Sequence, residues 1–378
     1  MADSLASRLP RWAVIRNARR RHRRRLTRRA MVLLALAALG VGLLTQRSNA
    51  GPQTRHPTRA ARLGSVTVGG LGGYVLAAEA SGDHVWVDTC VDLCGVGNTG
   101  LDEERLVEID AGSGVVIRRL PPLTNVEAWT LAGRSIWVAH LLSGEVTGHD
   151  PSNGRVTAKL RLRLPTPIVR NDRQFLPDSL SYAGDYVWVS TERGWIAQID
   201  ARTGALVRMF RTPSQNNVTA VDRHGTWVAE ELDGVGLLAP HSKRIRIHTI
   251  MQAGLPLDVY DVLNGGRTIW ALASPDTTEL NAEKVVLAID PRSGLVIHRV
   301  RVPTAESGAV VAGGALYLAD LVRGRIYRVS PDGTLATFST PRHDAWLATA
   351  SRGALWATTS VTPRQQRGQM LRISLPHE

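Results

Sequence analysis

The chain has 378 residues and a formal net charge of +13, which taken alone suggests a nucleic-acid-binding protein. Residues 1–50 contain twelve arginines and a single acid, Asp3, so the rest of the chain is close to neutral. This distribution excludes a basic nucleic-acid-binding surface as the explanation of the charge, and no nucleic-acid partner is predicted for residues 64–378. Because there are only two cysteines, a four-thiolate zinc site is excluded as well.

Three segments precede the predicted folded domain. Residues 1–29 are rich in arginine, and residues 30–46 are uncharged and apolar. A helix of that length is about 25 Å long, at the short limit for crossing a bilayer core of about 30 Å. The arginines predict that residues 1–29 stay in the cytoplasm and that the rest of the chain lies outside it. Residues 47–63 are polar and contain proline, which predicts a linker.

Residues 30–46 permit two interpretations. The first is an uncleaved signal-anchor, which makes the protein a single-pass protein of the cell membrane. The second is a signal peptide that is cleaved near Ala50, where the residues are small, and this interpretation predicts a secreted protein. In both interpretations residues 64–378 leave the cytoplasm.

Residues 64–378 contain a repeat. A glycine turn followed by a short apolar strand with one central aromatic residue occurs seven times, at Trp86, Trp137, Trp188, Trp227, Trp270, Tyr317 and Trp356. The spacing is close to the period of about 40 to 45 residues that is typical of propeller blades. The sequence therefore predicts an all-β fold, a seven-bladed β-propeller of four-stranded blades, preceded by one N-terminal hydrophobic helix.

A D-x-x-x-G turn also recurs, at residues 110–114, 150–154, 200–204 and 290–294. Asp satisfies the backbone of such a turn and Gly accepts a positive φ, so these residues are predicted to form hairpins. The last repeat has no fourth strand of its own. Residues 65–68 precede the first complete repeat and are predicted to supply that strand, which would close the ring.

Three repeats contain extra residues. If the strands of a blade are named A to D from the axis outward, two insertions fall between strands B and C, at residues 89–104 and 273–284. The third falls between strand D and the next strand A, at residues 165–177. Antiparallel pairing places BC and DA connections at the same end of the propeller. Insertions on one face of a repeat array are typical of a binding face.

A polar residue stands at the start of six of the innermost strands: Asn125, Asp178, Asn217, Asp258, Ser307 and Asp344. These residues are predicted to surround the channel mouth at the BC and DA end, where they could bind a polar ligand or a cation. The alternative is that they satisfy backbone groups at the strand ends.

Four further residues are candidates for acid–base chemistry. His140, Glu230 and Asp320 each follow an aromatic anchor by three residues, and His343 stands beside Asp344. They could equally be inert surface residues, because their mutual distances cannot be read from the sequence. Cys90 and Cys94 are close enough to form a disulfide across a small loop, with two free thiols as the alternative.

Residues 314–320 and 324–333 resemble the repeat of the streptogramin lyase family. That resemblance implies a seven-bladed propeller that opens a cyclic depsipeptide by Mg-assisted elimination, using His and Glu near the channel. Glu230 matches the family's glutamate, and His140 and Asp320 hold the same place in other blades. Mg is therefore the one metal that this resemblance would imply.

Two other propeller groups are similar. Residues 199–204 resemble the repeat of quinoprotein dehydrogenases, whose docking Trp is here replaced by Arg118, Ala158, Arg208 and His298. No pyrroloquinoline quinone is therefore expected. Residues 289–294 resemble YVTN-type surface and periplasmic propellers, which are mostly binding or interaction modules.

The sequence contains no nucleophile elbow, H-E-x-x-H pair or P-loop, so enzymatic activity is not favoured. The leading prediction is a propeller outside the cytoplasm that binds an unknown ligand or protein through its BC and DA end, with no cofactor. The alternative is a metal-assisted lyase or hydrolase that uses the same end.

Overall fold

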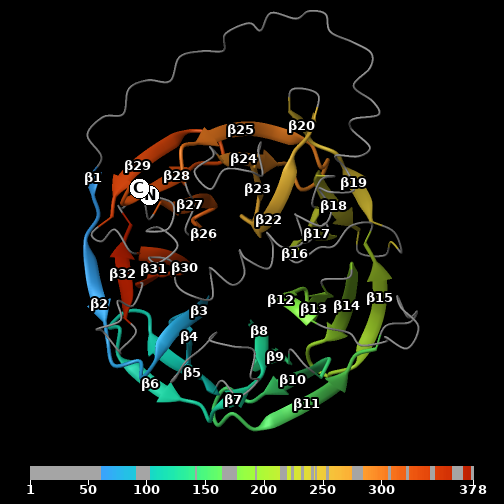
Figure 1. Ribbon diagram of the computed structural model, residues 1–378, viewed down its shortest axis with the longest axis vertical. Helices are drawn as coiled ribbons and strands as arrows, with labels where there is room; N and C mark the ends of the chain where they lie inside the picture. Colours follow the sequence, from blue (N-terminus) through green and yellow to red (C-terminus); the bar gives the residue numbers. More distant parts are fainter. Residues whose placement is uncertain are drawn as a thin grey trace, which may run out of the picture.

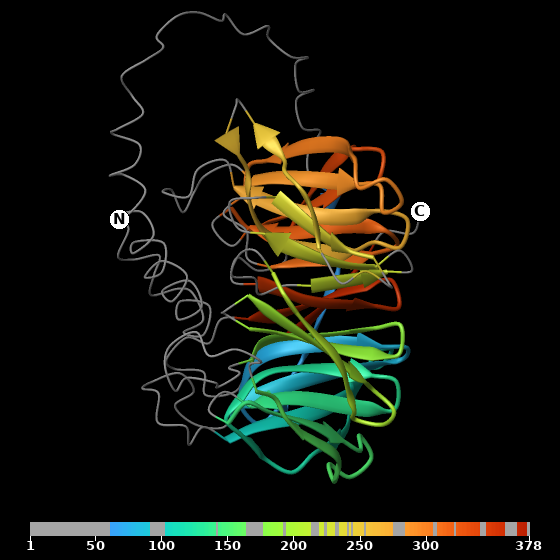
Figure 2. The same ribbon diagram turned by 90° about the vertical axis from the view of Figure 1, so that its right-hand side faces the viewer.

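The computed structural model describes residues 61–90, 103–140, 143–163, 177–191, 194–212, 219–222, 225–230, 234–239, 242, 245–252, 255–274, 284–304, 308–320, 323–340, 345–359 and 369–375. The predicted cytoplasmic segment and hydrophobic helix lie outside these residues. All elements in the described part are β-strands. They form seven blades around a central axis and one separate two-stranded sheet (Figure 1), and edge-on the ring is a disc (Figure 2).

The first three blades each run outward in chain order. Blade one consists of β3 (Tyr74–Ser81), β4 (His84–Cys90), β5 (Glu103–Asp110) and β6 (Val116–Arg119), with the short β7 (Leu123–Thr124) also paired to β5. Blade two consists of β8 (Val126–Ala132), β9 (Ser135–His140), β10 (Glu145–His149) and β11 (Val156–Arg161). Blade three consists of β12 (Pro177–Ala183), β13 (Tyr186–Thr191), β14 (Trp195–Asp200) and β15 (Leu206–Arg211).

The next three blades repeat this order. Blade four consists of β16 (Thr219–Asp222), β17 (Gly225–Glu230), β18 (Gly234–Leu238) and β19 (Arg246–His248). A small hairpin follows, made by β20 (Met251–Gln252) and β21 (Leu255–Pro256). Blade five consists of β22 (Asp258–Asn264), β23 (Ile269–Ser274), β24 (Lys284–Ile289) and β25 (Val296–Val302). Blade six consists of β26 (Ala309–Ala312), β27 (Ala315–Asp320), β28 (Arg325–Val329) and β29 (Leu335–Ser339).

Blade seven joins the two ends of the propeller, as predicted. Its inner strands are β30 (Ala345–Ser351), β31 (Ala354–Thr359) and β32 (Met370–Ser374), and its outermost strand is β2 (Ser65–Val68). β2 is antiparallel to β32, with Ser65 opposite Ile373 and Val68 opposite Met370. Figure 1 shows this pair as a blue strand beside a red one. Closure removes the exposed sheet edge that a three-stranded last blade would leave.

The last residues of the predicted linker are also paired. β1 (Ala61–Arg62) is parallel to β29, with Ala61 opposite Phe338, and adds a fifth strand to the outer edge of blade six. The chain therefore joins the ring at blade six before it closes blade seven.

The aromatic anchors form the core between blades. Trp137, Trp227, Trp270 and Trp356 are fully buried, and Trp86, Trp188 and Tyr317 are nearly so. The second strand of each blade packs against both neighbouring blades, so both of its faces are buried. Its sequence is therefore a continuous apolar run instead of an alternation of apolar and polar residues. Burial of one large apolar side chain stabilises the fold by roughly 1.5–3 kcal/mol.

The turn glycines contact the outer strand of the preceding blade. A Cβ atom added at Gly204, where φ is +73°, would lie 2.9 Å from the Cβ atom of Ala158. Corresponding contacts join Gly114 to Val68, Gly154 to Pro121, Gly294 to His248 and Gly333 to His298. These hairpins are therefore structural, as predicted, and each connects its blade to the one before it.

The positions that replace the quinoprotein docking tryptophan take part in the same contacts. Arg118 donates from Nη1 to the carbonyl oxygen of Pro151 at 3.2 Å, and Arg208 donates from Nη1 to the carbonyl oxygen of Ser242 at 3.2 Å. Ala158 and His298 instead pack against turn glycines of the next blade. At this position neighbouring blades are therefore joined by hydrogen bonds from guanidinium groups or by packing against a turn glycine, and not by a tryptophan.

Gly204→Ala is expected to lower the free energy of unfolding by about 2–4 kcal/mol. The added methyl group suffers the cost of a positive φ, roughly 1 kcal/mol, and also overlaps with Ala158. Gly266 is the matched control, because its φ is +80° and no atom lies within 4 Å of the added Cβ. Urea denaturation of both variants separates the two costs, and equal losses would contradict the inter-blade contact.

Candidate functional site

The two ends of the propeller differ in the length of their connections. Strands A and B are joined by tight hairpins, as between β3, which ends at Ser81, and β4, which begins at His84. At the other end the BC connection is short in blade two but long in blades one and five. β4 ends at Cys90 and β5 begins only at Glu103. The inserted residues themselves lie outside the described part of the chain.

A third long BC connection was not predicted. β31 ends at Thr359 and β32 begins at Met370, so blade seven also carries extra residues at this end. The length of this connection could not be compared with that of the other repeats. The closing strand of blade seven comes from the N-terminal end, so the last repeat has no D-x-x-x-G turn from which to measure.

The described members of the predicted polar ring lie at the same end. Asn125 immediately precedes β8, Asp178 is the second residue of β12, and Asp258 is the first residue of β22. Val126 pairs with His140 and Asp258 pairs with Ser274, so the strand A starts lie opposite the strand B ends. The side chain of Asp178 is not described, and Asn217, Ser307 and Asp344 lie outside the described residues.

Asn125 combines a left-handed backbone conformation with a buried amide oxygen. Its φ is +55°, a left-handed conformation that Asn tolerates better than most residues. Its amide oxygen is buried and has no hydrogen-bond partner among the described residues. The side chain therefore retains an unused acceptor at the end of the propeller that carries the insertions.

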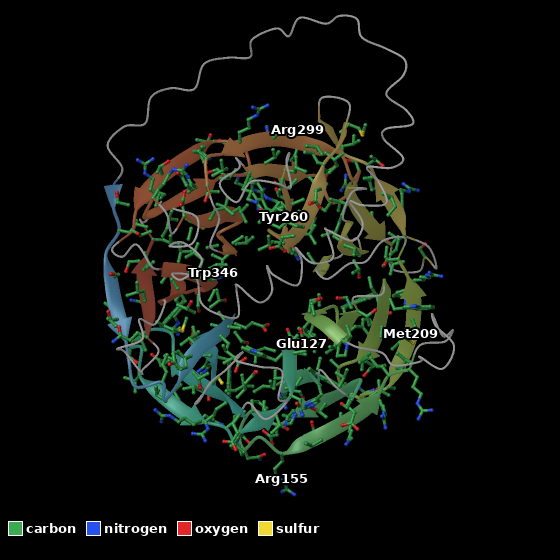
Figure 3. The ribbon with its side chains drawn as sticks, viewed as in Figure 1. Glu127, Arg155, Met209, Tyr260, Arg299 and Trp346 are labelled. Atoms are coloured by element: carbon green, nitrogen blue, oxygen red, sulfur yellow. The ribbon has the colours of Figure 1, made fainter. Side chains whose placement is uncertain are left out.

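Five inner strands contain a β-bulge, namely β3, β8, β12, β22 and β30, and in β8 and β22 the extra residue has a polar side chain that the structure describes. The pairing of β8 shifts between Val126 and Ala128, and that of β22 shifts between Val259 and Asp261, so Glu127 and Tyr260 are the extra residues. Bulges re-aim side chains in this way. Figure 3 shows Glu127 and Tyr260 on the axis side of the ring.

His140 belongs to a chain of hydrogen bonds within blade two. Its Nδ1 atom lies 3.1 Å from the carbonyl oxygen of Thr124, and its Nε2 atom lies 2.8 Å from the Thr147 hydroxyl. That hydroxyl is 2.8 Å from Nε2 of His149, whose Nδ1 is 3.1 Å from the carbonyl oxygen of Gly154. The chain thus extends from the segment before Asn125 to the D-x-x-x-G turn of blade two.

The donors and acceptors of this chain require one additional proton. The two carbonyl oxygens can only accept, so both Nδ1 atoms carry a hydrogen. If both rings were neutral, both Nε2 atoms would be acceptors, and Thr147 has a single hydroxyl hydrogen to donate. A proton on either ring satisfies all four contacts. Burial lowers the pKa of His149, which disfavours the charged form of that ring.

Thr147→Val is expected to uncouple the two histidines and to destabilise the protein by about 1–3 kcal/mol, because both Nε2 atoms lose their partner. Nitrogen chemical shifts measured by NMR during a pH titration report the protonation of each ring. The control is Thr157→Val, whose hydroxyl donates to the Gly148 carbonyl and contacts neither ring. Independent, unchanged titrations in the wild type and Thr147→Val would contradict the shared proton.

Asp320 is held in an internal ion pair. Its carboxylate accepts hydrogen bonds from Nη1 of Arg323 at 2.8 Å and from the Arg323 backbone nitrogen at 3.0 Å, and the residue is only 1% exposed. Arg323 also donates to the Pro303 carbonyl oxygen at 2.8 Å, and its pKa is raised chiefly by the hydrogen bond that it donates to Asp320. The ion pair links the last residue of β27 to the segment just before β28.

The remaining candidates are described incompletely. Glu230 is the last residue of β17, but its side chain is not described, and His343 lies outside the described residues. The predicted proximity of Glu230 and His140 stays a prediction. Cys90 is fully buried and disulfide-bonded, and Cys94 lies outside the described residues.

Sequence reasoning missed a group of carboxyl groups between blades one and two. Glu79 accepts hydrogen bonds from the Thr130 hydroxyl and the Leu131 backbone nitrogen, both at 3.1 Å. Burial raises the pKa of Glu79 to about 7. The Asp88 side chain is buried and hydrogen-bonds to Glu104, and burial raises the pKa of Asp88 as well.

The repeat contains the signal that would have identified Asp88. It stands two residues after the anchor, at a position that packs between blades. The other blades have smaller or uncharged residues there: Ala139, Ser190, Ala229, Leu272, Ala319 and Thr358. Comparison of the repeats position by position therefore marks Asp88 as exceptional.

Charge is segregated along the radius of the ring. The innermost strands contain acids and no Lys, Arg or His: Glu79, Glu127, Asp178, Asp222, Asp258 and Asp261. The outermost strands contain bases and no Asp or Glu: Arg118, Arg119, Lys159, Arg161, Arg208, Arg211, Arg246, Arg299 and Arg301, with His248 and His298. Figure 3 shows Glu127 near the axis and Arg299 on the outer side.

Two features are absent from the described part of the chain. No group of three or more His, Cys, Asp or Glu side chains there is arranged to hold a metal ion. No helix among the same residues is long and apolar enough to cross a bilayer, and residues 30–46 lie outside them.

No protein-family model matches the chain, and no curated protein sequence matches it. Solved structures do. Virginiamycin B lyase from Staphylococcus aureus has 13% identity and a TM-score of 0.58, over 82% of this chain and 99% of that chain. A streptogramin B lyase has 12% identity and a TM-score of 0.58, over 82% of this chain and 98% of that one. BamB from Moraxella catarrhalis has 14% identity and a TM-score of 0.49, over 84% and 92%.

At these identities the lyases share the fold of this chain. The predicted resemblance to the streptogramin lyase propellers is therefore confirmed as a resemblance of fold, over most of the chain. Fold alone does not carry an activity from one propeller to another.

Proposed function

We propose that this chain is a binding protein that acts outside the cytoplasm. Its N-terminal hydrophobic segment holds it at the membrane, and the BC and DA end of its propeller binds a ligand or a partner protein. The observation that carries the proposal is that the long connections of blades one, five and seven, and the one before blade three, all leave the same end. The opposite end has only tight hairpins among the described connections.

The internal contacts of two catalytic candidates favour binding over catalysis. Both ring nitrogens of His140 already have hydrogen-bond partners, and the Asp320 carboxylate is paired with Arg323. A general base must be able to reach the proton that it abstracts. Neither group offers a free atom for that purpose in this conformation.

The chemistry of the inner strands indicates the class of ligand. The acids at the strand A starts are Glu127, Asp178 and Asp258, and Asn125 adds an acceptor with no partner among the described residues. An ammonium group is already accepted at this end, because Nζ of Lys284 lies 4.9 Å from the ring centroid of Tyr260. A ligand with positive charge or several hydrogen-bond donors is therefore favoured.

A thermal-shift experiment on the full-length chain in detergent tests this proposal. Short oligolysine and oligoarginine peptides are compared with oligoglutamate, each with and without Mg²⁺. We expect the basic peptides to raise the Tm, and the increase to shrink at high salt. No increase with any basic peptide would contradict the proposed ligand class, whereas Mg²⁺-dependent cleavage of a peptide or depsipeptide would favour the lyase or hydrolase alternative.

A matched pair of variants locates the binding end. Asn125→Gly removes the amide and tolerates the positive φ, so we expect it to weaken the thermal shift. Asp185→Gly is the control, because Asp185 also has a positive φ, of 66°, but lies in the AB hairpin at the opposite end. Equal weakening by both variants would contradict binding at the BC and DA end.

Membrane retention is tested separately. Fractionation of cells followed by N-terminal sequencing of the mature chain distinguishes an anchor from a cleaved signal. A chain that keeps residues 30–46 and resists extraction by alkaline carbonate supports the anchor. A soluble mature chain that begins near Gly51 would contradict it.

A further inference from the structure

The exposed aliphatic residues of the described chain are confined to the rim of the ring. The large apolar side chains that are at least one third exposed are Val66, Val115, Ile117, Val156, Leu206, Val207, Met251, Leu295, Ile297 and Leu335. All lie in an outermost strand, at the residue just before one, or in the hairpin of β20 and β21. None lies on an inner strand, and only Met251 lies in a connection at the BC and DA end, because the hairpin of β20 and β21 joins the outermost strand of blade four to the innermost strand of blade five.

The same outer strands carry Arg and Lys without any acid. Aliphatic side chains mixed with cations are the composition that binds the interface of an anionic bilayer, because the apolar groups enter the headgroup boundary and the cations attract the lipid charge. A hydrated polyanion would use the cations but would leave the aliphatic groups in water. The composition therefore favours lipid over a soluble polyanion.

This composition is most concentrated at blade five. We define the blade-five rim patch as Met251, Leu295, Ile297, Arg299 and Arg301. The exposed fractions of Met251, Leu295 and Ile297 are 44%, 65% and 49%. Ile297, Arg299 and Arg301 are alternate residues of β25 and share one face of it. Nη1 of Arg299 donates to the Met251 carbonyl oxygen at 2.7 Å, which joins the hairpin to the strand.

Among the described residues beside the patch, the acid Asp290 is occupied by its own turn. Asp290 accepts hydrogen bonds from the backbone nitrogens of Arg292 and Ser293 and from the Ser293 hydroxyl. The Ser293 hydroxyl is the main cause of its lowered pKa. Its charge is therefore directed into the hairpin, and the side chains of the patch itself are neutral or positive.

The chain joins the ring next to this patch. β1 pairs with β29 on the outer edge of blade six, and Figure 1 shows β1, β29, β25 and β20 in succession around the rim. The residues between the predicted membrane segment, which ends at residue 46, and β1 can span about 45 Å when extended, at roughly 3.3 Å per residue. A bilayer that holds residues 30–46 is therefore within reach of the rim at blades five and six.

We propose that the blade-five rim patch lies on an anionic bilayer surface, so that the propeller stands on its rim with its axis along the membrane. This inference rests on the proposed membrane attachment. In that orientation the BC and DA end opens parallel to the membrane, accessible to ligands on the same surface. On the outer strands of the other blades, the Arg and Lys side chains prevent the exposed strand edge from pairing with an edge strand of another molecule.

Hydrogen exchange on the full-length chain in lipid nanodiscs tests the orientation. Exchange is compared between phosphatidylcholine nanodiscs and nanodiscs that also contain phosphatidylglycerol. We expect exchange at 251–252 and 296–302 to slow several-fold in the anionic nanodiscs. Exchange at 206–211 in blade three, a strand of similar composition, should not change. Equal exchange at blade five in both nanodiscs and in detergent would overturn the proposal.

Two variants separate the patch from general electrostatics. Ile297→Ser combined with Arg299→Ser should abolish the difference between the nanodiscs, while Val207→Ser combined with Arg211→Ser should leave it intact. Comparable losses with both pairs would overturn the assignment to blade five. Protection at blade five in native membranes but not in lipid nanodiscs would overturn it as well, in favour of a protein partner.

Failure of the anchor can be distinguished from failure of the patch. Comigration of the chain with the nanodisc reports the anchor. If the signal proves to be cleaved, flotation of the mature chain with phosphatidylglycerol vesicles replaces the nanodisc assay. Flotation that is lost in the Ile297 and Arg299 double variant supports the patch, and absence of flotation overturns it.

Discussion

Glu79→Gln is expected to raise the free energy of unfolding at pH 8 by about 3 kcal/mol and to leave it nearly unchanged at pH 4. Glu79 lies between blades one and two, and burial raises its pKa from 4.5 to about 7. A shift of that size corresponds to about 3 kcal/mol between the two protonation states. Gln resembles the protonated side chain in shape: its amide oxygen can accept from the Leu131 backbone nitrogen, and its amide nitrogen can donate to the Thr130 hydroxyl oxygen.

The direction of the pH dependence follows from this shift. A carboxyl group whose pKa is raised by folding favours the folded state fully below its unfolded pKa, near 4.5. That contribution is lost as the pH rises toward 7. The wild type should therefore lose about 3 kcal/mol from Glu79 between pH 4 and pH 8, and Asp88 adds a loss of the same sign.

Urea denaturation at several pH values measures this effect. Glu103→Gln is the control, because Glu103 is an exposed carboxylate on β5 of the same blade. Its removal should change the stability by less than 1 kcal/mol at any pH. A pH slope that is the same in the wild type and Glu79→Gln would show that Glu79 is ionised in the folded protein at neutral pH.

Val68→Asp is expected to destabilise the protein by about 4 kcal/mol, the largest loss predicted here for a single residue. Val68 ends the closing strand β2, is 4% exposed, and packs with Trp356, Val107 and Met370 where blades seven and one meet. An unpaired carboxylate at that position is buried without a partner, which costs several kcal/mol or forces protonation.

Val66→Asp is the matched control on the same strand. Val66 is 57% exposed, so the same substitution should cost less than about 1 kcal/mol. For a domain of this size each kcal/mol lowers the Tm by roughly 2–4 °C, so the two variants should differ by about 6–12 °C. If both variants unfolded at the wild-type temperature, β2 would not be the strand that closes blade seven.

The sequence predicted the parts of the fold that repeat. The aromatic anchors and the D-x-x-x-G turns recur at fixed offsets, so their roles as core and hairpin could be inferred, and the missing last strand could be matched to residues 65–68. β1, β7 and the hairpin of β20 and β21 were not predicted. Each is a pairing of two residues, too short to leave a periodic pattern.

The sequence predicted which end of the propeller carries the candidate residues, but not which contacts their side chains make. The end that carries the insertions follows from chain length alone, and Asn125, Asp258 and His140 do lie there. The role of His140 could not be inferred, because its link to His149 depends on the pairing of β9 with β10 and on the Thr147 rotamer. Glu79 and Asp88 were not predicted, because the candidates were chosen at strand ends and these two acids lie within β3 and β4.

The order in which the chain enters the ring has a mechanical consequence. Residues 61–68 lie first along the edge of blade six and then form the outer strand of blade seven, where Val68 also contacts the turn glycine of blade one. Any tension on the N-terminal segment therefore acts on the one joint that is not covalently continuous around the ring. β1 must detach before that tension reaches β2, so a two-residue strand on the rim protects the closure from forces transmitted by a tether.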